Sequence, residues 1–266
     1  MCIDISFHSD IQLTRDAFPG LIDKSNIQLS PEFSEQIFGI VFPPYNVIAG
    51  TDNGLELLSM EWGVIPSWIK DPVEIKKRRM KMLNIQSERI YDDKKSVWYR
   101  IKKNKILIPV DGIFEHREIK GWKKKVPYYV RPIGGEPFYI PGLYQELQTV
   151  DEDGVVHTSL SFGLITRPAN TKMCNIHNSG DNKHRMPLFT RFDMSQAWIS
   201  QSLQENEARE ILSFEIPDDD LECYPVYSIR GNVLRPDGKH KYEPWDWPGL
   251  PPLGDDMAVN PQKKLF

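Results

Sequence analysis

Cysteine and long hydrophobic runs are scarce in this sequence. Its 266 residues include only Cys2, Cys174 and Cys223, an odd count without paired spacing that argues against a disulfide framework or a four-cysteine zinc site. No stretch approaches the ~18 uninterrupted apolar residues that a membrane helix needs, and the N-terminus lacks the basic and apolar regions of a signal peptide. We therefore expect a cytoplasmic protein, nucleoid-associated if bacterial, with no membrane partner.

Several common catalytic motifs are also absent. The sequence contains no G-x-G-x-x-G, no phosphate-binding loop ending in Gly-Lys-Ser/Thr, no H-E-x-x-H and no G-x-S-x-G. The usual nucleotide-binding, zinc-protease and serine-hydrolase classes therefore lose support, and we expect no cofactor. Cys174, His177 and His184 lack a fourth ligand and a familiar spacing, so we expect no metal either.

The composition is that of an ordinary globular chain, with 40% hydrophobic residues and 21 prolines. No repeat or low-complexity linker divides it, so we expect one domain over residues 1–248 and a C-terminal extension over 249–266 that wraps the surface or is partly disordered. Short apolar or alternating runs bounded by turn residues predict strands at 46–49, 55–62, 105–110, 127–131, 137–140 and 159–166. The steps Asp111-Gly112 and Gly134-Gly135 predict turns, the second within a hairpin.

Helical periodicity is confined to a few segments. Residues 193–203 and 205–214 each place apolar side chains on one face, and Pro31 after Ser30 predicts a helix over 31–38. The fold class predicted is α+β, a mainly antiparallel, barrel-like β core with peripheral helices.

Positive charge is concentrated in one part of the chain. Residues 70–131 hold 19 Lys and Arg against eight Asp and Glu, although the whole chain has a net charge of −4. Such a segment is typical of a face that binds nucleic acid or phosphate, and a merely solvated surface is the alternative.

Cys2 has unusual chemistry if Met1 is removed. Its thiol and its free α-amine would then lie on adjacent carbons. An α-amine has a pKa near 7.7–8.0, against about 10.4 for lysine, so far more of it is unprotonated at neutral pH. It can form a Schiff base with an aldehyde, and the thiol can close onto the imine carbon as a thiazolidine. Alternatively, the amine can act as the base for its own thiol in an attack on an amide.

Behind Met-Cys, further segments follow in a recognisable order. They are 62–68 (WGVIPSW), 84–88 (NIQSE), 112–116 (GIFEH), and Thr166 followed eleven residues later by His177 and then by 185–187 (RMP). In this order the sequence resembles the SRAP family, the SOS response-associated peptidases, whose members sense abasic sites in single-stranded DNA. The resemblance spans residues 2 to about 187 and extends loosely to 224–226 and 231–233.

The resemblance implies a catalytic site of four residues. Cys2 would form the DNA crosslink, and Asn84, Glu115 and His177 would complete the site. Glu115 could shuttle the protons that ring opening and dehydration require, and His177 could supply the ring-opening proton or reverse the crosslink. Asn84 could orient the α-amine or a sugar oxygen without competing for protons. His184 is the less suitable histidine, because it lies eighteen residues from Thr166.

The DNA contacts depart from the family pattern. Gln86 stands where the family usually has an Arg that contacts phosphate, and His116 where it has a Trp. Lys70, the cations between 76 and 81, or Arg89 could compensate, and at least one of Trp62 and Trp68 is expected to be core. The DNA-binding residues expected are Arg185, Trp68, Thr166, Gln86, Lys70 and Arg89.

Three functions remain open from the sequence. The first is a monomeric SRAP protein that crosslinks to abasic sites in single-stranded DNA, with the peptidase activity on its own N-terminus and the lyase activity that the family implies. The second is an N-terminal-nucleophile cysteine amidohydrolase that needs no DNA. The third is a non-catalytic single-stranded DNA-binding module, whose binding depends on salt and survives Cys2→Ala.

Overall fold

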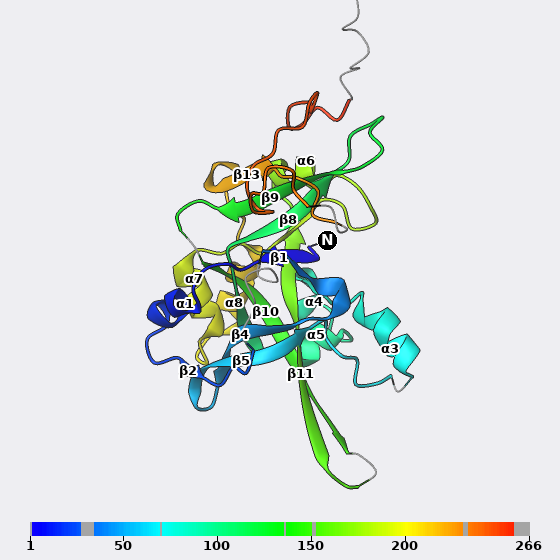
Figure 1. Ribbon diagram of the computed structural model, residues 1–266. Coiled ribbons are helices and arrows are strands. Elements are labelled where there is room, and N and C mark those ends of the chain that lie inside the picture. The colour runs from blue at the N-terminus through cyan, green and yellow to red at the C-terminus, as the bar shows by residue number, and fades with distance from the viewer. Residues whose placement is uncertain are drawn as a thin grey trace, which may run out of the picture.

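The computed structural model describes residues 2–27, 35–69, 71–135, 137–150, 153–230 and 234–257. Within these ranges most regular structure is β (Figure 1). The strands are β1 (Asp4–Ser6), β2 (Ile22–Asp23), β3 (Ile37–Phe38), β4 (Pro44–Thr51), β5 (Gly54–Trp62), β6 (Asn84–Gln86), β7 (Lys105–Val110), β8 (Gly112–Arg117), β9 (Val126–Pro132), β10 (Phe138–Val150), β11 (Val156–Pro168), β12 (Arg185–Pro187) and β13 (Leu221–Pro225).

The helices are short and lie around the sheets. They are α1 (Ile11–Ala17), α3 (Pro72–Arg79), α4 (Glu88–Tyr91), α5 (Val97–Arg100), α6 (Thr171–Ile176), α7 (Phe192–Ile199) and α8 (Glu205–Ser213), with 3-10 turns η1 (Gly39–Val41) and η2 (Asp218–Asp220). None of the helices in the described ranges is long and apolar enough to cross a membrane.

The strands form two sheets that share one large hydrophobic cluster, and a second cluster joins the larger sheet to α7 and α8. The larger has the order β12-β11-β10-β7-β4-β5-β2, with β6 also paired to β11. A parallel pairing of β11 with β5, in which Phe162 lies opposite Trp62, closes β5, β4, β7, β10 and β11 into a ring. The smaller sheet has the order β13-β9-β8-β1-β3. The barrel-like α+β fold predicted from the strand pattern is therefore confirmed.

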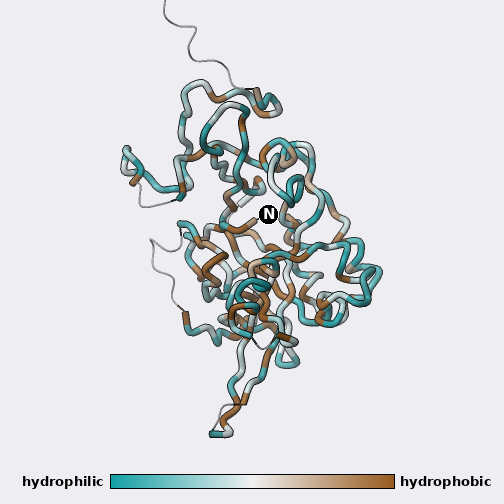
Figure 2. The backbone as a smooth tube through the Cα atoms, turned by 90° about the vertical axis from the view of Figure 1, so that its right-hand side faces the viewer, coloured by the Kyte–Doolittle hydropathy of each residue, from teal (hydrophilic) through white to brown (hydrophobic). Residues whose placement is uncertain are grey.

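The core lies where the barrel and the smaller sheet meet. Hydrophobic segments gather there (Figure 2). Trp62 is completely buried, stacks on Phe162 with 6.3 Å between ring centroids, and donates from Nε1 to the carbonyl of Leu83 at 3.0 Å. This bond ties β5 to the segment that leads into β6, and it confirms that one of the two expected tryptophans is core.

Two local predictions were wrong. Gly134-Gly135 does not close a hairpin, because β9 pairs within the smaller sheet and β10 within the larger one, so this step carries the chain between sheets. The helix predicted over 31–38 ends in strand β3 at Ile37–Phe38, where pairing with β1 overrides local preference; residues 31–34 lie outside the described ranges.

The helices predicted near 193–203 and 205–214 are confirmed as α7 and α8. In α8, Gln204 and Glu207 form a capping box, and Ala208, Ile211 and Leu212 are its buried face. The first part of the C-terminal segment packs on the smaller sheet. The fully buried guanidinium of Arg117 donates to the carbonyls of Pro251 and Pro252 at 2.9 and 2.6 Å. The domain boundary at 248 stays a prediction.

Candidate active site and cationic groove

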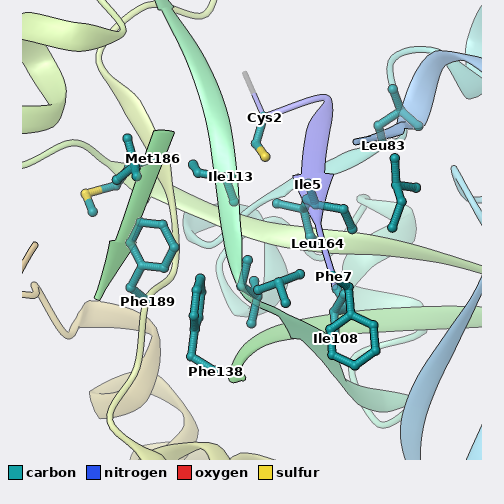
Figure 3. Close-up of a cluster of buried hydrophobic side chains, with 14 of the residues drawn as sticks. Cys2, Ile5, Phe7, Leu83, Ile108, Ile113, Phe138, Leu164, Met186 and Phe189 are labelled. Atoms are coloured by element: carbon teal, nitrogen blue, oxygen red, sulfur yellow. The ribbon is translucent and has the colours of Figure 1, made fainter. Parts of the chain in front are cut away.

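Cys2 lies two residues before β1, where the two sheets meet. Its side chain is 1% exposed and belongs to the same apolar cluster as Ile5 and Ile113 (Figure 3). Its Sγ lies 3.6 Å from the carbonyl oxygen of Asp4, to which the thiol donates. Burial raises the pKa of the Cys2 thiol well above its usual value, and the charge of Glu115 acts in the same direction. The thiol is therefore protonated at neutral pH.

Asn84 connects Cys2 to the barrel. Strand β6 lies parallel to β11, with Asn84 opposite Leu164, and this pairing directs the Asn84 amide toward the N-terminus. Nδ2 donates to the carbonyl oxygen of Cys2 at 2.8 Å, and the side chain is only 7% exposed. Its Oδ1 is buried and has no hydrogen-bond partner among the residues that the structure describes. An acceptor is thus held beside the nucleophile.

Glu115 reaches the site from β8, which pairs with β1 through Ile113 and Ile5. The strand begins at Gly112, where a Cβ would lie 2.1 Å from Cζ of Tyr129, so only glycine leaves room for that ring. The Glu115 side chain is 4% exposed, and its charge acts on both Cys2 and His177. The sequence-predicted acid, nucleophile and histidine therefore share one buried site.

His177 caps the C-terminal end of α6 and is 7% exposed. Its Nδ1 lies 2.8 Å from the carbonyl oxygen of Arg185. Because a carbonyl can only accept, the proton lies on Nδ1 and Nε2 is the basic nitrogen. Burial lowers the pKa of His177, although Glu115 raises it, so the imidazole is neutral at pH 7.

The segment between His177 and Arg185 folds back on itself. The amide of His184 donates to the carbonyl of His177 at 2.8 Å, and His184 itself is exposed, with a φ of 61°. This arrangement supports the spacing argument that favoured His177 over His184. Within the described ranges, no group of three or more His, Cys, Asp or Glu side chains is placed to hold a metal ion.

A cationic groove of about 750 Å³ opens beside Asn84. Five of the residues predicted to bind DNA line it, namely Trp68, Gln86, Arg89, Thr166 and Arg185. Lys70 lies outside the described residues. The groove also collects cations from the basic segment that were not singled out, including Arg78, Lys81, Lys95 and Arg100. Part of the positive charge of residues 70–131 therefore lines the groove beside the buried site.

Arg185 is held rigidly at the groove. Its terminal nitrogens donate to the two carboxylate oxygens of Glu88 at 2.9 and 3.0 Å, and one also donates to the carbonyl of Thr166 at 2.8 Å. Burial alone would raise the pKa of the Glu88 carboxyl. The paired hydrogen bonds and the charge of Arg185 outweigh burial, so the pKa is lowered. Thr166 is 2% exposed, and its hydroxyl accepts from Nε of Arg185 at 3.3 Å. Thr166 therefore positions Arg185.

Not every expected cation faces the groove. Arg79, in the run predicted to compensate for Gln86, is 9% exposed and donates to the carbonyl of Gly63 and to Glu61, both at 2.6 Å. Its guanidinium also lies over the ring of Phe42, 4.4 Å from the centroid. Arg79 therefore fixes the turn after β5. Trp68, by contrast, lines the groove and is 50% exposed.

Comparison with known proteins agrees with this geometry. The family model for the SOS response associated peptidase (SRAP) matches residues 1–233. The chain belongs to the SRAP family. The abasic site processing protein YoaM of Bacillus subtilis (strain 168) is 27% identical to it over 216 residues, which cover 80% of this chain and 88% of that protein.

More distant SRAP relatives and solved structures extend the comparison. The abasic site processing protein YMR114C of Saccharomyces cerevisiae is 24% identical over 177 residues, covering 65% of this chain and 43% of that protein. A crystal structure of a protein from Bacteroides thetaiotaomicron superposes with a TM-score of 0.68 at 22% identity, over 97% of this chain and all of that one. The latter likeness shows a common fold.

Two positions that depart from the SRAP pattern occupy different surroundings. Gln86 lines the groove beside Asn84. His116 follows Glu115 on β8, and burial lowers the pKa of its imidazole to about 4. It is therefore a neutral ring at physiological pH. Glu88, the last residue of the 84–88 motif, was not predicted to have a role, yet it is the first residue of α4 and binds Arg185.

Proposed function

We propose that this SRAP protein processes abasic sites in single-stranded DNA by crosslinking to them through Cys2 once Met1 has been removed. The observation that carries the proposal is the position of Asn84, which lines the cationic groove and also binds the carbonyl of Cys2 at 2.8 Å. A single DNA strand bound along the groove would therefore place its abasic deoxyribose beside Cys2. The family match and the relatives named as abasic site processing proteins support the same substrate.

The chemistry begins at the amine. The ring-opened deoxyribose carries an aldehyde at C1′, and the α-amine of Cys2 adds to it to give a carbinolamine. Loss of water then gives the imine, whose nitrogen takes up a proton, and Sγ adds to the imine carbon while the thiol proton passes to a neighbouring base. A new C–S bond closes a five-membered thiazolidine. The raised pKa of the buried Cys2 thiol is compatible with this order, because the amine attacks first and the thiol enters as a protonated group.

Glu115 and His177 supply the proton transfers. Glu115 is the buried carboxyl beside the nucleophile, so we assign to it the proton that dehydration delivers to the departing hydroxyl and the proton taken from Sγ. The neutral imidazole of His177 suits proton exchange with the sugar oxygen during ring opening, and during reversal of the adduct. We assign to Asn84 the orientation of the N-terminal residue through its amide.

The other functions have weaker support. An N-terminal-nucleophile amidase relies on the α-amine to take the proton of the Cys2 thiol, and burial disfavours this transfer because it raises the pKa of that thiol. A purely non-catalytic DNA-binding module would leave the buried carboxyl and histidine around Cys2 without a role. The peptidase activity is assigned to removal of Met1 alone. We further propose that the protein acts as a monomer in the compartment that holds the chromosome.

The test is crosslink formation on a denaturing gel. Met-processed protein is mixed with a single-stranded oligonucleotide that carries one abasic site, and we expect a heat-stable shifted band. Cys2→Ala should abolish the band. Cys174→Ala, which removes a different and less buried thiol, should leave it unchanged. An intact oligonucleotide and one whose abasic aldehyde has been reduced with borohydride should both fail to react. Absence of the band from protein with a confirmed N-terminal cysteine would overturn the proposal.

A further inference from the structure

A second fixed guanidinium lies close to Cys2, outside the groove. Asp4, two residues after the nucleophile, is 0% exposed, and both of its carboxylate oxygens accept hydrogen bonds from Arg230. Gln36 donates to the same carboxylate at 2.8 Å. The guanidinium carbon also lies over the ring of Phe38, 4.0 Å from its centroid. The fork and the ring together hold Arg230 in one orientation.

The pair presents its positive end to the surface. The carboxylate of Asp4 is buried, whereas the side chain of Arg230 is 36% exposed. A guanidinium has five N–H donors, of which the fork to Asp4 uses two. No hydrogen bond from Nε is found to any residue in the described ranges. Nearby, Lys241 contacts Gln36 at 3.2 Å, and Glu35 binds His240 at 2.5 Å. Arg230 therefore retains donors for an anion.

Arg230 and Arg185 reach the site from different sheets. Arg185 lies on β12 of the larger sheet and lines the groove, whereas Arg230 follows β13 and is bound to β1 of the smaller sheet. The charge of Arg230 acts on His116, which neighbours Glu115 on β8. Cys2 lies two residues before Asp4, to which Arg230 is bound, and its carbonyl accepts a hydrogen bond from Asn84, which lines the groove together with Arg185. Each arginine is held by a carboxylate, Glu88 for Arg185 and Asp4 for Arg230.

We propose that Arg230 binds a backbone phosphate of the DNA strand on the side of the lesion away from the groove, with Asp4 as its positioning residue. The inference rests on the proposed function, because it takes Cys2 as the place of the lesion. A phosphodiester is the anion that a single strand offers at every nucleotide, and its two free oxygens match the remaining donors of a guanidinium. The strand would thus be held by one arginine on each side of the abasic sugar.

The test measures non-covalent binding as a function of salt. Cys2→Ala protein is titrated with a fluorescent single strand that carries a tetrahydrofuran abasic analogue, between low and moderate salt. For single strands, each lost phosphate contact reduces the slope of log K against log salt concentration by about 0.7. We expect that reduction for Arg230→Gln. Arg191→Gln, which removes a cation paired with Asp193 on the surface, should leave the slope unchanged.

Shortened oligonucleotides locate the contact. Two shortened oligonucleotides are used, one ending directly on the 5′ side of the analogue and one on the 3′ side. Arg230→Gln should reduce the salt slope with only one of them, and Arg185→Gln with only the other. An unchanged slope, or an equal effect of Arg230→Gln with both shortened strands, would overturn the inference.

A second variant guards against misfolding. Arg230→Gln leaves the buried Asp4 carboxylate without its cation, which is destabilising. The double variant Asp4→Asn with Arg230→Gln removes both charges and should fold while showing the same reduced slope. Crosslinking by the wild-type chain is scored separately. A missing crosslink with an Arg230-dependent slope would overturn only the proposed chemistry, and a normal crosslink with an unchanged slope would overturn only the Arg230 contact.

Discussion

Asn84 donates from Nδ2 to the carbonyl oxygen of Cys2 across 82 positions of sequence, at a distance of 2.8 Å. This one bond joins the barrel, which carries the groove, to the strand that carries the nucleophile. It fixes the backbone of the residue that becomes the N-terminus when Met1 is removed. In the crosslinking reaction that we propose, the geometry therefore depends on an amide that has no acid or base role of its own.

Replacement of Asn84 by Asp tests that bond. At pH 7.5 the new carboxylate would face a carbonyl that can only accept, so a buried acceptor would lose its donor, at a cost of ~1–3 kcal/mol. We expect crosslinking to slow about 10- to 100-fold, with partial recovery toward pH 5 as the carboxyl becomes a donor. The control is Asn46→Asp, whose amide also donates to a carbonyl at 2.8 Å but on β4. Equal rates for the two variants would contradict the assignment.

Trp62 and Trp68 separate stability from binding. Trp62 is completely buried, so Trp62→Ala should lower the free energy of unfolding by about 3–5 kcal/mol. Trp68 is 50% exposed in the groove, and Trp68→Ala should change the unfolding free energy little while weakening single-strand binding by ~1–3 kcal/mol through lost base stacking. Urea unfolding and fluorescence anisotropy measure the two effects. Normal DNA affinity for folded Trp68→Ala would remove this residue from the interface.

Glu88→Gln should move affinity and rate in opposite directions. Loss of the carboxylate makes the groove more positive, so undamaged single strands should bind about twofold more tightly. Gln offers Arg185 only one acceptor, so the arginine becomes less fixed and crosslinking at saturating DNA should slow several-fold. Glu205→Gln, which loosens Arg209 on exposed α8, is the matched control. A parallel rise or fall of both quantities would refute the positioning role.

His116 makes stability depend on pH. Its pKa in the folded protein is about 4, against 6.5 for an ordinary histidine, so the unfolded chain binds more protons between these values. The contribution is therefore complete above pH 6.5 and is lost as the pH falls toward 4, by about 3 kcal/mol. Urea unfolding of wild type and His116→Gln across pH 4–7 should show a shallower pH dependence for the variant. Parallel curves would contradict the shifted pKa.

Local patterns in the sequence predicted much of the fold. Strands β7 and β11 follow from apolar runs between turn residues, and α8 from its amphipathic spacing. Pairing partners were not predictable, because two adjacent strands with a Gly-Gly step between them can form a hairpin or join different sheets. Here β9 pairs with β8 and β13 in the smaller sheet, and β10 pairs with β7 and β11 in the larger one. The step at 134–135 therefore connects the two sheets.

The sequence by itself determined the chemical groups of the site. A cysteine behind Met1, motif residues at set spacings and a basic segment were sufficient to predict the family, which the comparison confirmed. Only the tertiary structure decided which cations are available. Arg79 is buried against Gly63 and Glu61, whereas Arg230 lies beside the nucleophile because Asp4, 226 positions away, binds it. The burial and direction of a long side chain depend on contacts between distant strands, and no local pattern records them.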